Sequence, residues 1–437
     1  MSKMTDAGKT IIFFSLHYPF HFTDSYLDEE LNLLAAKFNK LIIVSSNTFT
    51  KESRPTPANS IVYRFTPVAT GKTRLQALSL LIKPFFYQEL FNLFFLYKTV
   101  PGPAVIKELF AFYGRVLATK EKLRSIISEQ QVDESQLLIY TYWMVESTMA
   151  AVMQKQQRPA IRVVARAHSQ DVYFERNPVG FHPYRRFIFN GLNLLFFISD
   201  NARQYFIRKH AITSNDAYAK ISINRIGINS DNRHYAPASG KEVLRIVSVA
   251  YIQKLKRIDL IIDALALMQN MKIEWVHVGH SNQSESDFEK MKAYAATRLG
   301  AMRNVSVTFT GKTPKDALFR LYEEKRFDVF LNVSETEGIP VSMMEAMSYS
   351  VPVIGTNVGG VSEIVEHGLN GYLLSAYPTA GEVKEALERF SLLPDAEKDK
   401  LRINAFNTWQ TKYNATKNYN ELVYQVADLM NEDSNQR

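Results

Sequence analysis

Short apolar runs alternate with amphipathic stretches along the first half of the chain. Residues 10–15 and 40–45 are apolar runs with the length of a buried strand, and residues 27–38 between them carry apolar positions at helical spacing. The same strand-like pattern returns at residues 136–140, 161–165, 194–199 and 220–225. Strands that alternate with helices at this spacing predict an α/β domain with a parallel sheet and right-handed crossovers.

A polar, turn-rich segment at residues 227–240 is typical of a linker and precedes a second pattern of the same kind. Strand-like runs follow at residues 243–249, 273–278, 305–309, 328–333 and 351–354. Helical stretches lie between them, the first at residues 258–268, and a last helix is expected at residues 409–430. The pattern therefore predicts a second parallel sheet and a second domain.

Residues 75–100 are unusually apolar and long enough to suggest a membrane span. Lys83 and Glu89 interrupt the stretch, and charges at that depth are costly in hydrocarbon. We interpret the stretch as helices of the first domain. The alternative is a surface patch that rests on a membrane through its aromatic residues with Lys83 and Lys98.

Composition narrows the classes of function. The 437 residues suffice for two or three domains, and the absence of cysteine excludes disulfides, thiolate zinc sites and cysteine nucleophiles. The net charge of +8 fits phosphorylated substrates, an anionic membrane surface or solubility alone. No nucleic-acid motif and no metal-binding motif accompany it, so we expect neither partner. The start of the chain lacks the apolar run of a signal peptide, which predicts a cytoplasmic protein.

Candidate chemistry is densest between two predicted strands, at residues 334–371. Glu337 lies on the loop after the first strand, Pro340 suits the first turn of a helix, and Glu345 lies inside that helix. Free N–H groups at such a helix start form an anion site. Two carboxylates beside it fit a sugar nucleotide, with the amides on the diphosphate and the acids on hydroxyls. Alternatively, Glu345 favours the helix dipole and Glu337 is a solvated charge.

Two other polar segments follow predicted strands. Residues 166–176 come directly after the strand at 161–165, where an α/β sheet places its site. Lys254, Lys256 and Arg257 place three cations in four residues before the helix at 258–268. Cations there oppose the helix dipole unless an anion is bound, and a diphosphate supplies one. The alternatives are a structural ion network and a solvated basic turn.

The spacing of these residues resembles the E-x7-E signature of the family 4 retaining glycosyltransferases. The matching positions are Glu337-Gly338-Ile339-Pro340, Glu345-Ala346-Met347, Pro352, Gly359-Gly360, Glu363-Ile364-Val365 and Asn370-Gly371. The resemblance implies an α/β GT-B fold, in which two Rossmann-like domains face each other across a cleft. Residues 1–235 would bind the acceptor and residues 241–405 the donor, with residues 406–437 returning to the first domain as a helix.

The resemblance also implies roles for single residues. Glu337 would hold hydroxyls of the transferred sugar, Glu345 those of the ribose, and Lys256 the donor phosphates. Tyr251 stands where some members have an arginine, for which Lys254, Arg257 or the phenol of Tyr251 itself substitutes. Residues 166–176 resemble the family segment R-A-H-x-x-D-x-Y-x-E-R, whose histidine faces the donor sugar, and here it is His168. The remaining expected donor-binding residues are Gly338, Ile339, Pro340, Val341, Gly279 and Lys312, and the expected acceptor-cleft residues are His21, Tyr142, Arg166 and Asp171.

The expected function is transfer of a sugar from a UDP- or GDP-sugar to a glycan or lipid-linked acceptor hydroxyl, with retention and with neither metal nor cofactor. Bacterial surface or lipid-linked polysaccharide synthesis is the expected setting, in the cytoplasm or peripherally on the inner face of the membrane. One alternative is a non-catalytic nucleotide- or glycan-binding partner, which Tyr251 and the absence of glycines from the first strand–helix loop would suit. The other is a GT-B epimerase or phosphorylase.

Overall fold

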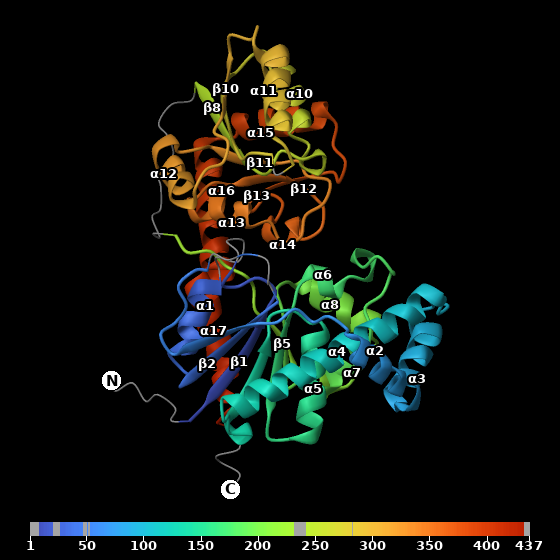
Figure 1. Ribbon diagram of the computed structural model, residues 1–437. Coiled ribbons are helices and arrows are strands. Elements are labelled where there is room, and N and C mark those ends of the chain that lie inside the picture. The colour runs from blue at the N-terminus through green and yellow to red at the C-terminus, as the bar shows by residue number, and fades with distance from the viewer. Residues whose placement is uncertain are drawn as a thin grey trace. The chain divides into compact units, whose positions relative to one another are not determined.

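The computed structural model describes residues 8–20, 27–46, 50, 53–230, 242–281 and 283–431. The chain divides into two compact units (Figure 1). The first unit is Met1–Ile226 with Ala415–Arg437, and the second unit is Gly227–Asn414.

The first unit contains a seven-stranded parallel sheet in the order β3-β2-β1-β4-β5-β6-β7. Its strands are β1 (Thr10–Ser15), β2 (Lys40–Ser45), β3 (Ser60–Arg64), β4 (Leu137–Thr141), β5 (Arg162–Ala167), β6 (Leu194–Phe197) and β7 (Ile221–Ile223). Both faces are covered, since Ile12 and Phe14 join one core cluster while Ile11 and Phe13 join another. This two-sided burial explains why the strands are continuous apolar runs.

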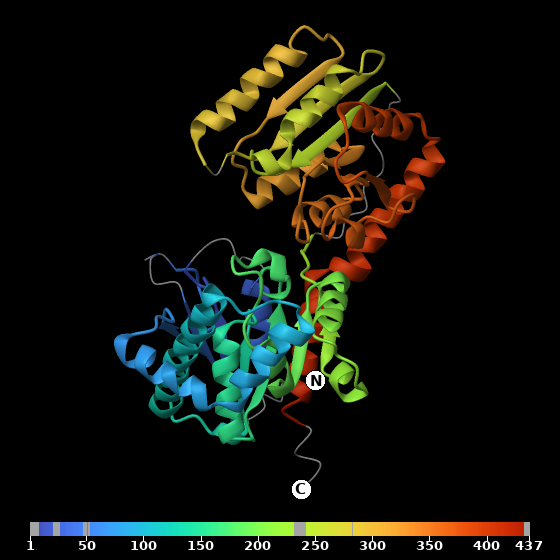
Figure 2. The same ribbon diagram turned by 90° about the vertical axis from the view of Figure 1, so that its right-hand side faces the viewer.

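Helices cover the two faces of this sheet. They are α1 (Leu27–Ala35), α2 (Gly71–Gln76), α3 (Pro84–Phe91), α4 (Pro103–Glu129), α5 (Glu146–Gln157), α6 (Ser169–Val172), α7 (Arg185–Gly191), α8 (Asp200–Lys209), α9 (Asn215–Ala219) and α17 (Ala415–Asp428). The last helix lies beside α1 (Figures 1 and 2), and Leu422 shares a core with Leu31. The chain thus returns to its first unit at α17.

The apolar stretch at residues 75–100 forms helical pieces, as predicted. A 3-10 helix, η2 (Ala77–Ile82), follows α2, and a π-helical turn, η3 (Asn92–Leu96), follows α3. Leu80 and Leu93 are buried, but Ile82 and Phe91 are mostly exposed. The interpretation as core helices is therefore correct for one face and wrong for the other. Across the described residues, no helix is long and apolar enough to cross a membrane.

The second unit contains a six-stranded parallel sheet in the order β10-β9-β8-β11-β12-β13. Its strands are β8 (Val243–Val249), β9 (Lys272–Val278), β10 (Val305–Phe309), β11 (Val329–Asn332), β12 (Val353–Thr356) and β13 (Gly371–Leu374). Its helices are α10 (Ile258–Ala266), α11 (Glu285–Leu299), α12 (Lys315–Lys325), α13 (Val341–Ser348), α14 (Val361–Ile364), α15 (Ala380–Leu392) and α16 (Asp395–Thr408). The strand order reverses between β8 and β11, and such a switch point opens a crevice at the carboxyl ends of the strands.

The two units divide at other residues than predicted. The expected return at residue 406 is wrong, because Phe406, Trp409 and Tyr413 are buried in the core of the second unit. Trp409 also donates from Nε1 to the carbonyl oxygen of Ile228, at 3.1 Å. The chain therefore leaves the second unit only after Asn414.

Candidate functional site

Lys256 and Glu337 form an ion pair at the switch point of the second sheet. Lys256 ends a 3-10 turn after β8, and Glu337 lies on the loop after β11. Lys256 Nζ lies 2.7 Å from Glu337 Oε1, and both side chains are largely buried. The two loops are also joined by the backbone, since the N–H of Glu335 donates to the carbonyl of Leu255 at 2.9 Å. Sequence reasoning placed both residues near one anion site, and the structure brings them together.

The end of β11 holds Glu337 in place. Asn332 Nδ2 donates to Glu337 Oε1 at 3.1 Å, and Asn332 Oδ1 accepts from the N–H of Ser334 at 3.1 Å. Thr356 at the end of β12 donates to the carbonyl of Ser334 at 2.6 Å. Sequence reasoning missed Asn332 and Thr356, although each is a polar residue within two positions of the end of a predicted apolar run. The carboxylate is therefore oriented before any ligand arrives.

Two glycines let the next loop approach this carboxylate. Gly359 has φ +53°, and a Cβ atom there would overlap the carbonyl oxygen of Glu337. A Cβ atom at Gly360 would overlap the carbonyl oxygen of Gly338, which accepts the Gly360 N–H at 2.8 Å. Only residues without a side chain fit this contact.

The first turn of α13 points its amides beyond the carboxyl end of β11. Pro340 precedes the helix, and no side chain caps it. The N–H groups of Val341 and Ser342 belong to the set that an α-helix leaves without intrahelical acceptors. Together with the helix dipole they form an anion site. Gly338 and Ile339 belong to the same loop and are half-buried.

Glu345 lies one turn further along α13. Burial raises the pKa of its carboxyl to about 7, and the charge of Lys315 on α12 opposes this shift. Among the described residues, its carboxylate forms no hydrogen bond and no ion pair. It is a carboxylate whose hydrogen-bonding capacity is unused by the protein.

Gly279 and Gly311 bring the carboxyl ends of β9 and β10 together. Gly279 has φ +143°, and a Cβ atom there would overlap the carbonyl of Ala250. Its N–H donates to the carbonyl of Gly311 at 3.2 Å. Lys312 follows on the loop and is exposed.

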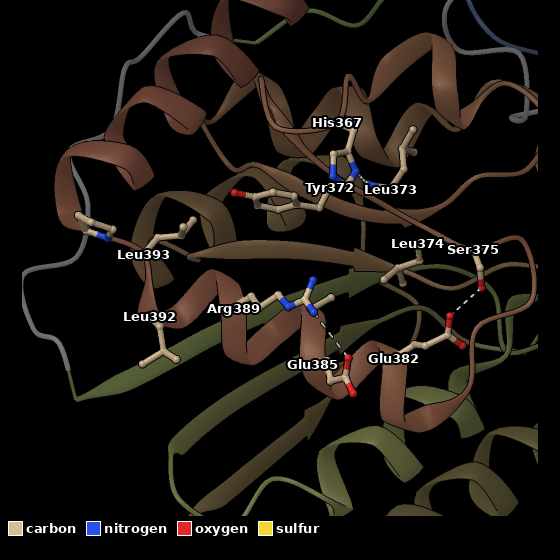
Figure 3. A pocket seen from close by; sticks show the side chains of 12 residues that line it. His367, Tyr372, Leu373, Leu374, Ser375, Glu382, Glu385, Arg389, Leu392 and Leu393 are labelled. Carbon is tan, nitrogen blue, oxygen red and sulfur yellow. Dashed lines mark hydrogen bonds and ion pairs between the residues drawn. The ribbon is translucent and has the colours of Figure 1, made fainter.

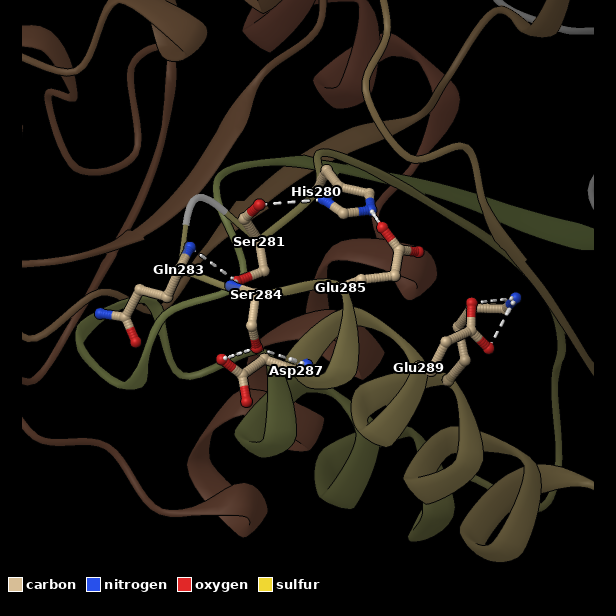
Figure 4. A network of polar contacts seen from close by, with 8 residues as sticks. His280, Ser281, Gln283, Ser284, Glu285, Asp287 and Glu289 are labelled. Atoms are coloured by element: carbon tan, nitrogen blue, oxygen red, sulfur yellow. Dashed lines mark hydrogen bonds and ion pairs between the residues drawn. The ribbon is translucent and has the colours of Figure 1, made fainter.

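A polar network that sequence reasoning missed braces the loop after Gly279 (Figure 4). His280 Nε2 lies 3.0 Å from Glu285 Oε2, and its ring stacks on Phe288 with centroids 4.3 Å apart. Ser284 accepts from the N–H of Asp287 and donates to its carboxylate, which caps α11. A hydrogen bond with the backbone of Ser281, followed by the interaction with Glu285, raises the pKa of His280. The Ser-x-x-Asp spacing at residues 284–287 is the signal that could have predicted the cap.

The other predicted cations of this turn, Arg257 and Lys254, have different surroundings from Lys256. Arg257 has φ +52°, and its Nη2 donates to the carbonyl of Pro378 at 2.8 Å. Its Nη1 is buried and has no hydrogen-bond partner among the described residues. Tyr251 is 58% exposed, and Lys254 is exposed as well. Lys256 is thus the cation of this turn that meets a candidate acid.

In the first unit, His168 follows β5 and is buried. Its ring stacks on Trp143 with centroids 4.3 Å apart and contacts Tyr142 at 4.6 Å. Burial, and then the charge of Arg166, hold the pKa of His168 well below its usual range. Its Nε2 has no hydrogen-bond partner among the residues described. A neutral imidazole with one unused nitrogen suits hydrogen bonding to a hydroxyl.

The expectation that Arg166 lines an acceptor cleft is wrong. Arg166 is 0% exposed, donates from Nη1 to Glu30 Oε2 at 2.6 Å, and also hydrogen-bonds Asn224. Glu30 lies on α1, so the sequence of residues 166–176 alone gives no sign of this ion pair. Its guanidinium also lies over the ring of Tyr142, 5.2 Å from the centroid.

Asp171 and Tyr142 are also buried and support His168 instead of lining a cleft. Asp171 Oδ1 accepts from the N–H of His168 and Oδ2 from the N–H of Met144, both at 2.6 Å. Burial raises the pKa of Asp171 to about 6. His21 lies outside the described residues.

A separate cavity of about 670 Å³ lies between β13 and α15 of the second unit (Figure 3). Its lining includes His367, Tyr372, Glu385 and Arg389, and no residue predicted as part of the site. In the part of the chain that the structure describes, no three His, Asp or Glu side chains are grouped as a metal would need.

Comparison with known proteins gives one match to a family model. Residues 231–408 match the model described as glycosyl transferases group 1. This segment nearly coincides with the second unit, which carries Lys256, Glu337 and Glu345.

Curated relatives match parts of the chain. The amylovoran biosynthesis glycosyltransferase AmsK of Erwinia amylovora is 28% identical over 165 residues, which cover 35% of this chain and 38% of that protein. The N-acetyl-alpha-D-glucosaminyl L-malate synthase of Bacillus anthracis is 41% identical over 70 residues, or 16% of this chain and 18% of that enzyme. The matched segments thus span well under two thirds of these relatives.

Solved structures match almost the whole chain. The lipopolysaccharide outer core galactosyltransferase WaaB aligns with a TM-score of 0.65 and 15% identity, over 95% of this chain and 99% of that one. The sucrose-phosphate synthase of Thermosynechococcus elongatus aligns with a TM-score of 0.64 and 15% identity, over 96% and 99%. The fold is therefore that of GT-B glycosyltransferases, with two Rossmann-like units.

Proposed function

We propose that the protein is a retaining glycosyltransferase of the family 4 type, which moves a sugar from a nucleoside-diphosphate sugar to an acceptor hydroxyl. The ion pair of Lys256 with Glu337, beside the uncapped first turn of α13, carries this proposal. A cation and free amides that suit a diphosphate thus lie next to a carboxylate that suits sugar hydroxyls. The family match of the second unit and the polysaccharide enzymes among the relatives support it.

The chemistry requires charge stabilisation at the leaving group. As the bond from the anomeric carbon to the phosphate oxygen breaks, negative charge grows on the diphosphate. Lys256 and the amides of Val341 and Ser342 stabilise that charge as preorganised groups. Lys256 exchanges part of its contact with Glu337 for the phosphate, and Glu337 then accepts hydrogen bonds from the transferred sugar. Glu345 does the same for the ribose, and His168 is the residue of the first unit that the family resemblance assigns to the transferred sugar.

Retention follows from attack on the face that the diphosphate leaves. The acceptor oxygen bonds to the anomeric carbon while its proton passes to the departing phosphate oxygen. No protein base is needed in this scheme, because the departing phosphate oxygen takes the proton. Neither a metal nor a cofactor takes part in this scheme.

UDP- or GDP-sugars are the proposed donors, and one similar structure is a complex of Anabaena HepE with UDP and glucose. The proposed acceptor is a glycan or a lipid-linked saccharide in bacterial polysaccharide synthesis, because relatives are named for amylovoran and colanic acid biosynthesis. Cytoplasmic location with peripheral attachment to the inner face of a membrane belongs to the same proposal.

A matched pair of lysine variants tests the mechanism. Lys256→Ala should lower turnover by about 10²-fold or more, as removal of one oxyanion donor does. Lys254→Ala, on the same 3-10 turn but exposed, should stay within about threefold of wild type. The assay measures nucleotide release from a panel of UDP-, GDP- and ADP-sugars, with and without candidate acceptors. NMR of the product assigns its anomeric configuration, which must match that of the donor.

Some results would contradict the proposal. An inverted product would refute retention, and a Glu337→Ala variant with wild-type kcat/KM would falsify the role of that acid. A second candidate function is a non-catalytic nucleotide-binding partner, which the exposed Tyr251 at the arginine position favours. Nucleotides that raise the melting temperature in a thermal-shift screen, with no turnover of any sugar nucleotide, would support it.

A further inference from the structure

The first unit exposes many large apolar side chains along α2, η2, α3, η3 and the residues that follow η3. Each is between 49% and 77% exposed: Leu75, Leu78, Leu81, Ile82, Tyr87, Phe91, Phe94, Phe95 and Val100. In the described part of the second unit, exposed apolar side chains such as Tyr377 and Leu392 are spread over separate elements. A concentration of this kind marks an interaction surface on a folded protein. We call it the apolar face.

The spacing shows that these helical pieces carry apolar side chains on both their buried and their exposed faces. Leu75, Leu78 and Leu81 recur every three residues on one side, while Ala77 and Leu80 are buried on the other. Tyr87, Phe91 and Phe95 recur every four residues in the same way.

Internal contacts join the two rows into one surface. Tyr87 donates to the carbonyl of Leu81 at 2.6 Å, which connects α3 to η2. The rings of Phe91 and Phe95 lie 4.5 Å apart, and those of Phe94 and Phe95 4.9 Å apart. In both ribbon views, α2 and α3 lie on the side of the first unit away from α17 (Figures 1 and 2).

Cations outnumber acids around the apolar face, although Lys72 pairs with the exposed Glu121 of α4 at 2.8 Å. Residues 68–107 contain five cations, Lys72, Arg74, Lys83, Lys98 and Lys107, and a single acid, Glu89. Glu89 is buried and accepts the N–H of Tyr184 at 2.8 Å, so it contributes little to the surface. Arg74 and Lys98 are exposed beside the apolar rows. Apolar and aromatic side chains flanked by cations complement an anionic bilayer surface.

We propose that the apolar face binds the surface of an anionic lipid bilayer. Phe91, Phe94 and Phe95 enter the boundary between headgroups and acyl chains, while Arg74 and Lys98 meet lipid phosphates. The purpose of this binding is to bring the enzyme to a lipid-linked acceptor, and in this respect the inference rests on the proposed function. Binding itself requires no catalysis.

Hydrogen bonds connect the apolar face to the candidate sugar contact. Glu89 on α3 holds the backbone of Tyr184, and the next residue, Arg185, donates from Nε to the carbonyl of Asp171 at 3.1 Å. Asp171 in turn accepts the N–H of His168. A bilayer bound to the apolar face is therefore held at a fixed place relative to His168.

Vesicle sedimentation with the full-length protein tests the proposal. Wild type should sediment with vesicles of equal parts phosphatidylcholine and phosphatidylglycerol, and far less with phosphatidylcholine alone. The triple variant Phe91→Ser, Phe94→Ser, Phe95→Ser should bind the anionic vesicles at least about tenfold more weakly. Its melting temperature should match that of wild type, because all three side chains are exposed. Tyr377→Ser with Leu392→Ser, on the second unit, is the matched control and should bind like wild type.

A charge variant keeps the test informative if the triple variant fails to fold. Arg74→Glu with Lys98→Glu should abolish the preference for anionic vesicles. The proposal is overturned if wild type stays in the supernatant with both vesicles, or if the charge variant binds as wild type does. It is also overturned if wild type forms a dimer in sedimentation velocity that the triple variant loses, since a second copy then covers the face.

The outcome is separable from that of the proposed function. Lys256→Ala should bind vesicles as wild type does, and the triple variant should release nucleotide in the presence of a water-soluble acceptor at the wild-type rate. Failure of vesicle binding with intact turnover would remove the proposed membrane attachment and leave the glycosyltransferase activity standing.

Discussion

Glu345 illustrates how burial sets the charge of a single candidate residue. Desolvation raises the pKa of its carboxyl from 4.5 to about 7. In the unfolded chain the carboxyl releases its proton near pH 4.5. Between pH 4.5 and about 7 the folded state therefore binds this proton more tightly than the unfolded state does. The stability gained from protonation is therefore fully present below pH 4.5 and is lost as the pH rises through about 7.

The variant Glu345→Gln should remove this pH dependence. Because a neutral amide avoids the cost of a buried charge, we expect a higher melting temperature than wild type at about pH 8 and a smaller difference at pH 4.5. The same variant should bind nucleotide more weakly at about pH 8, since the carboxylate is the stronger acceptor for ribose hydroxyls. Differential scanning fluorimetry with and without nucleotide measures both effects. Glu324→Gln on α12, where the side chain is exposed, is the control, and an equal shift at both pH values would refute the explanation.

The location of a single residue could be predicted where the end of a strand determines which residues lie near it. Lys256 and Glu337 lie far apart in the sequence, but each follows a strand of a parallel sheet, so both belong at the same edge. Arg166 also lies near the carboxyl end of a strand, β5, yet its side chain turns back to Glu30 in the core. A pattern of strands places the backbone of a residue, whereas a distant ion pair decides where a long side chain ends.

At the scale of elements, the loop between β12 and α14 must fit against the loop that carries Glu337. Two features of Gly359 serve this fit, namely a left-handed backbone and the absence of a Cβ atom. Gly368 has a left-handed backbone as well, with φ +80°, but a Cβ atom there would meet nothing within 4 Å. A comparison of the two positions therefore separates the effect of backbone strain from that of steric overlap by a Cβ atom.

Gly359→Ala should destabilise the protein by about 3 kcal/mol or more, because strain and overlap with the Glu337 carbonyl add. Gly368→Ala should cost only about 1 kcal/mol, from strain alone. Urea unfolding gives both values. We also expect Gly359→Ala to lower kcat/KM more than Gly368→Ala does, since only the former displaces Glu337. Equal losses at the two positions would show that the contact with Glu337 is unimportant.

Elements with a strong apolar signal were predicted, whereas some without one were missed. The strands β1 and β2 were predicted with their observed bounds, because both are buried on two faces. The edge strand β3 escaped prediction, since its positions are half-exposed or exposed and carry no strong apolar signal. The pieces between residues 71 and 96 are apolar on both sides, so hydrophobicity alone could not tell their buried face from their exposed one.

At the scale of the whole molecule, the pattern predicted two sheets but misplaced the point where the chain returns. A helical period continues through residues 395–428, and periodicity does not reveal which core each turn enters. Trp409 and Tyr413 belong to the second unit, and Leu422 and Val426 to the first. The division therefore follows from burial and not from the linker composition that sequence reasoning used.

This division predicts that residues 227–414 fold alone. They contain their own sheet, two buried clusters, and all of Lys256, Glu337, Glu345 and the first turn of α13. We expect the isolated segment to unfold in one cooperative transition and to bind nucleoside diphosphate with an affinity close to that of the full chain, measured by calorimetry. Lys256→Ala in the same segment should weaken that binding.

The complementary truncation should behave differently. A chain that ends at Asn414 leaves the face of α1 without Leu422, Val423 and Val426, whose burial is worth about 1.5–3 kcal/mol each. We therefore expect the first unit of this truncated chain to melt earlier or aggregate, while its second unit still binds nucleotide. If instead the isolated residues 227–414 are unfolded, or bind no nucleotide although the full chain does, then the donor site depends on the first unit, and the assignment of donor binding to the second unit alone fails.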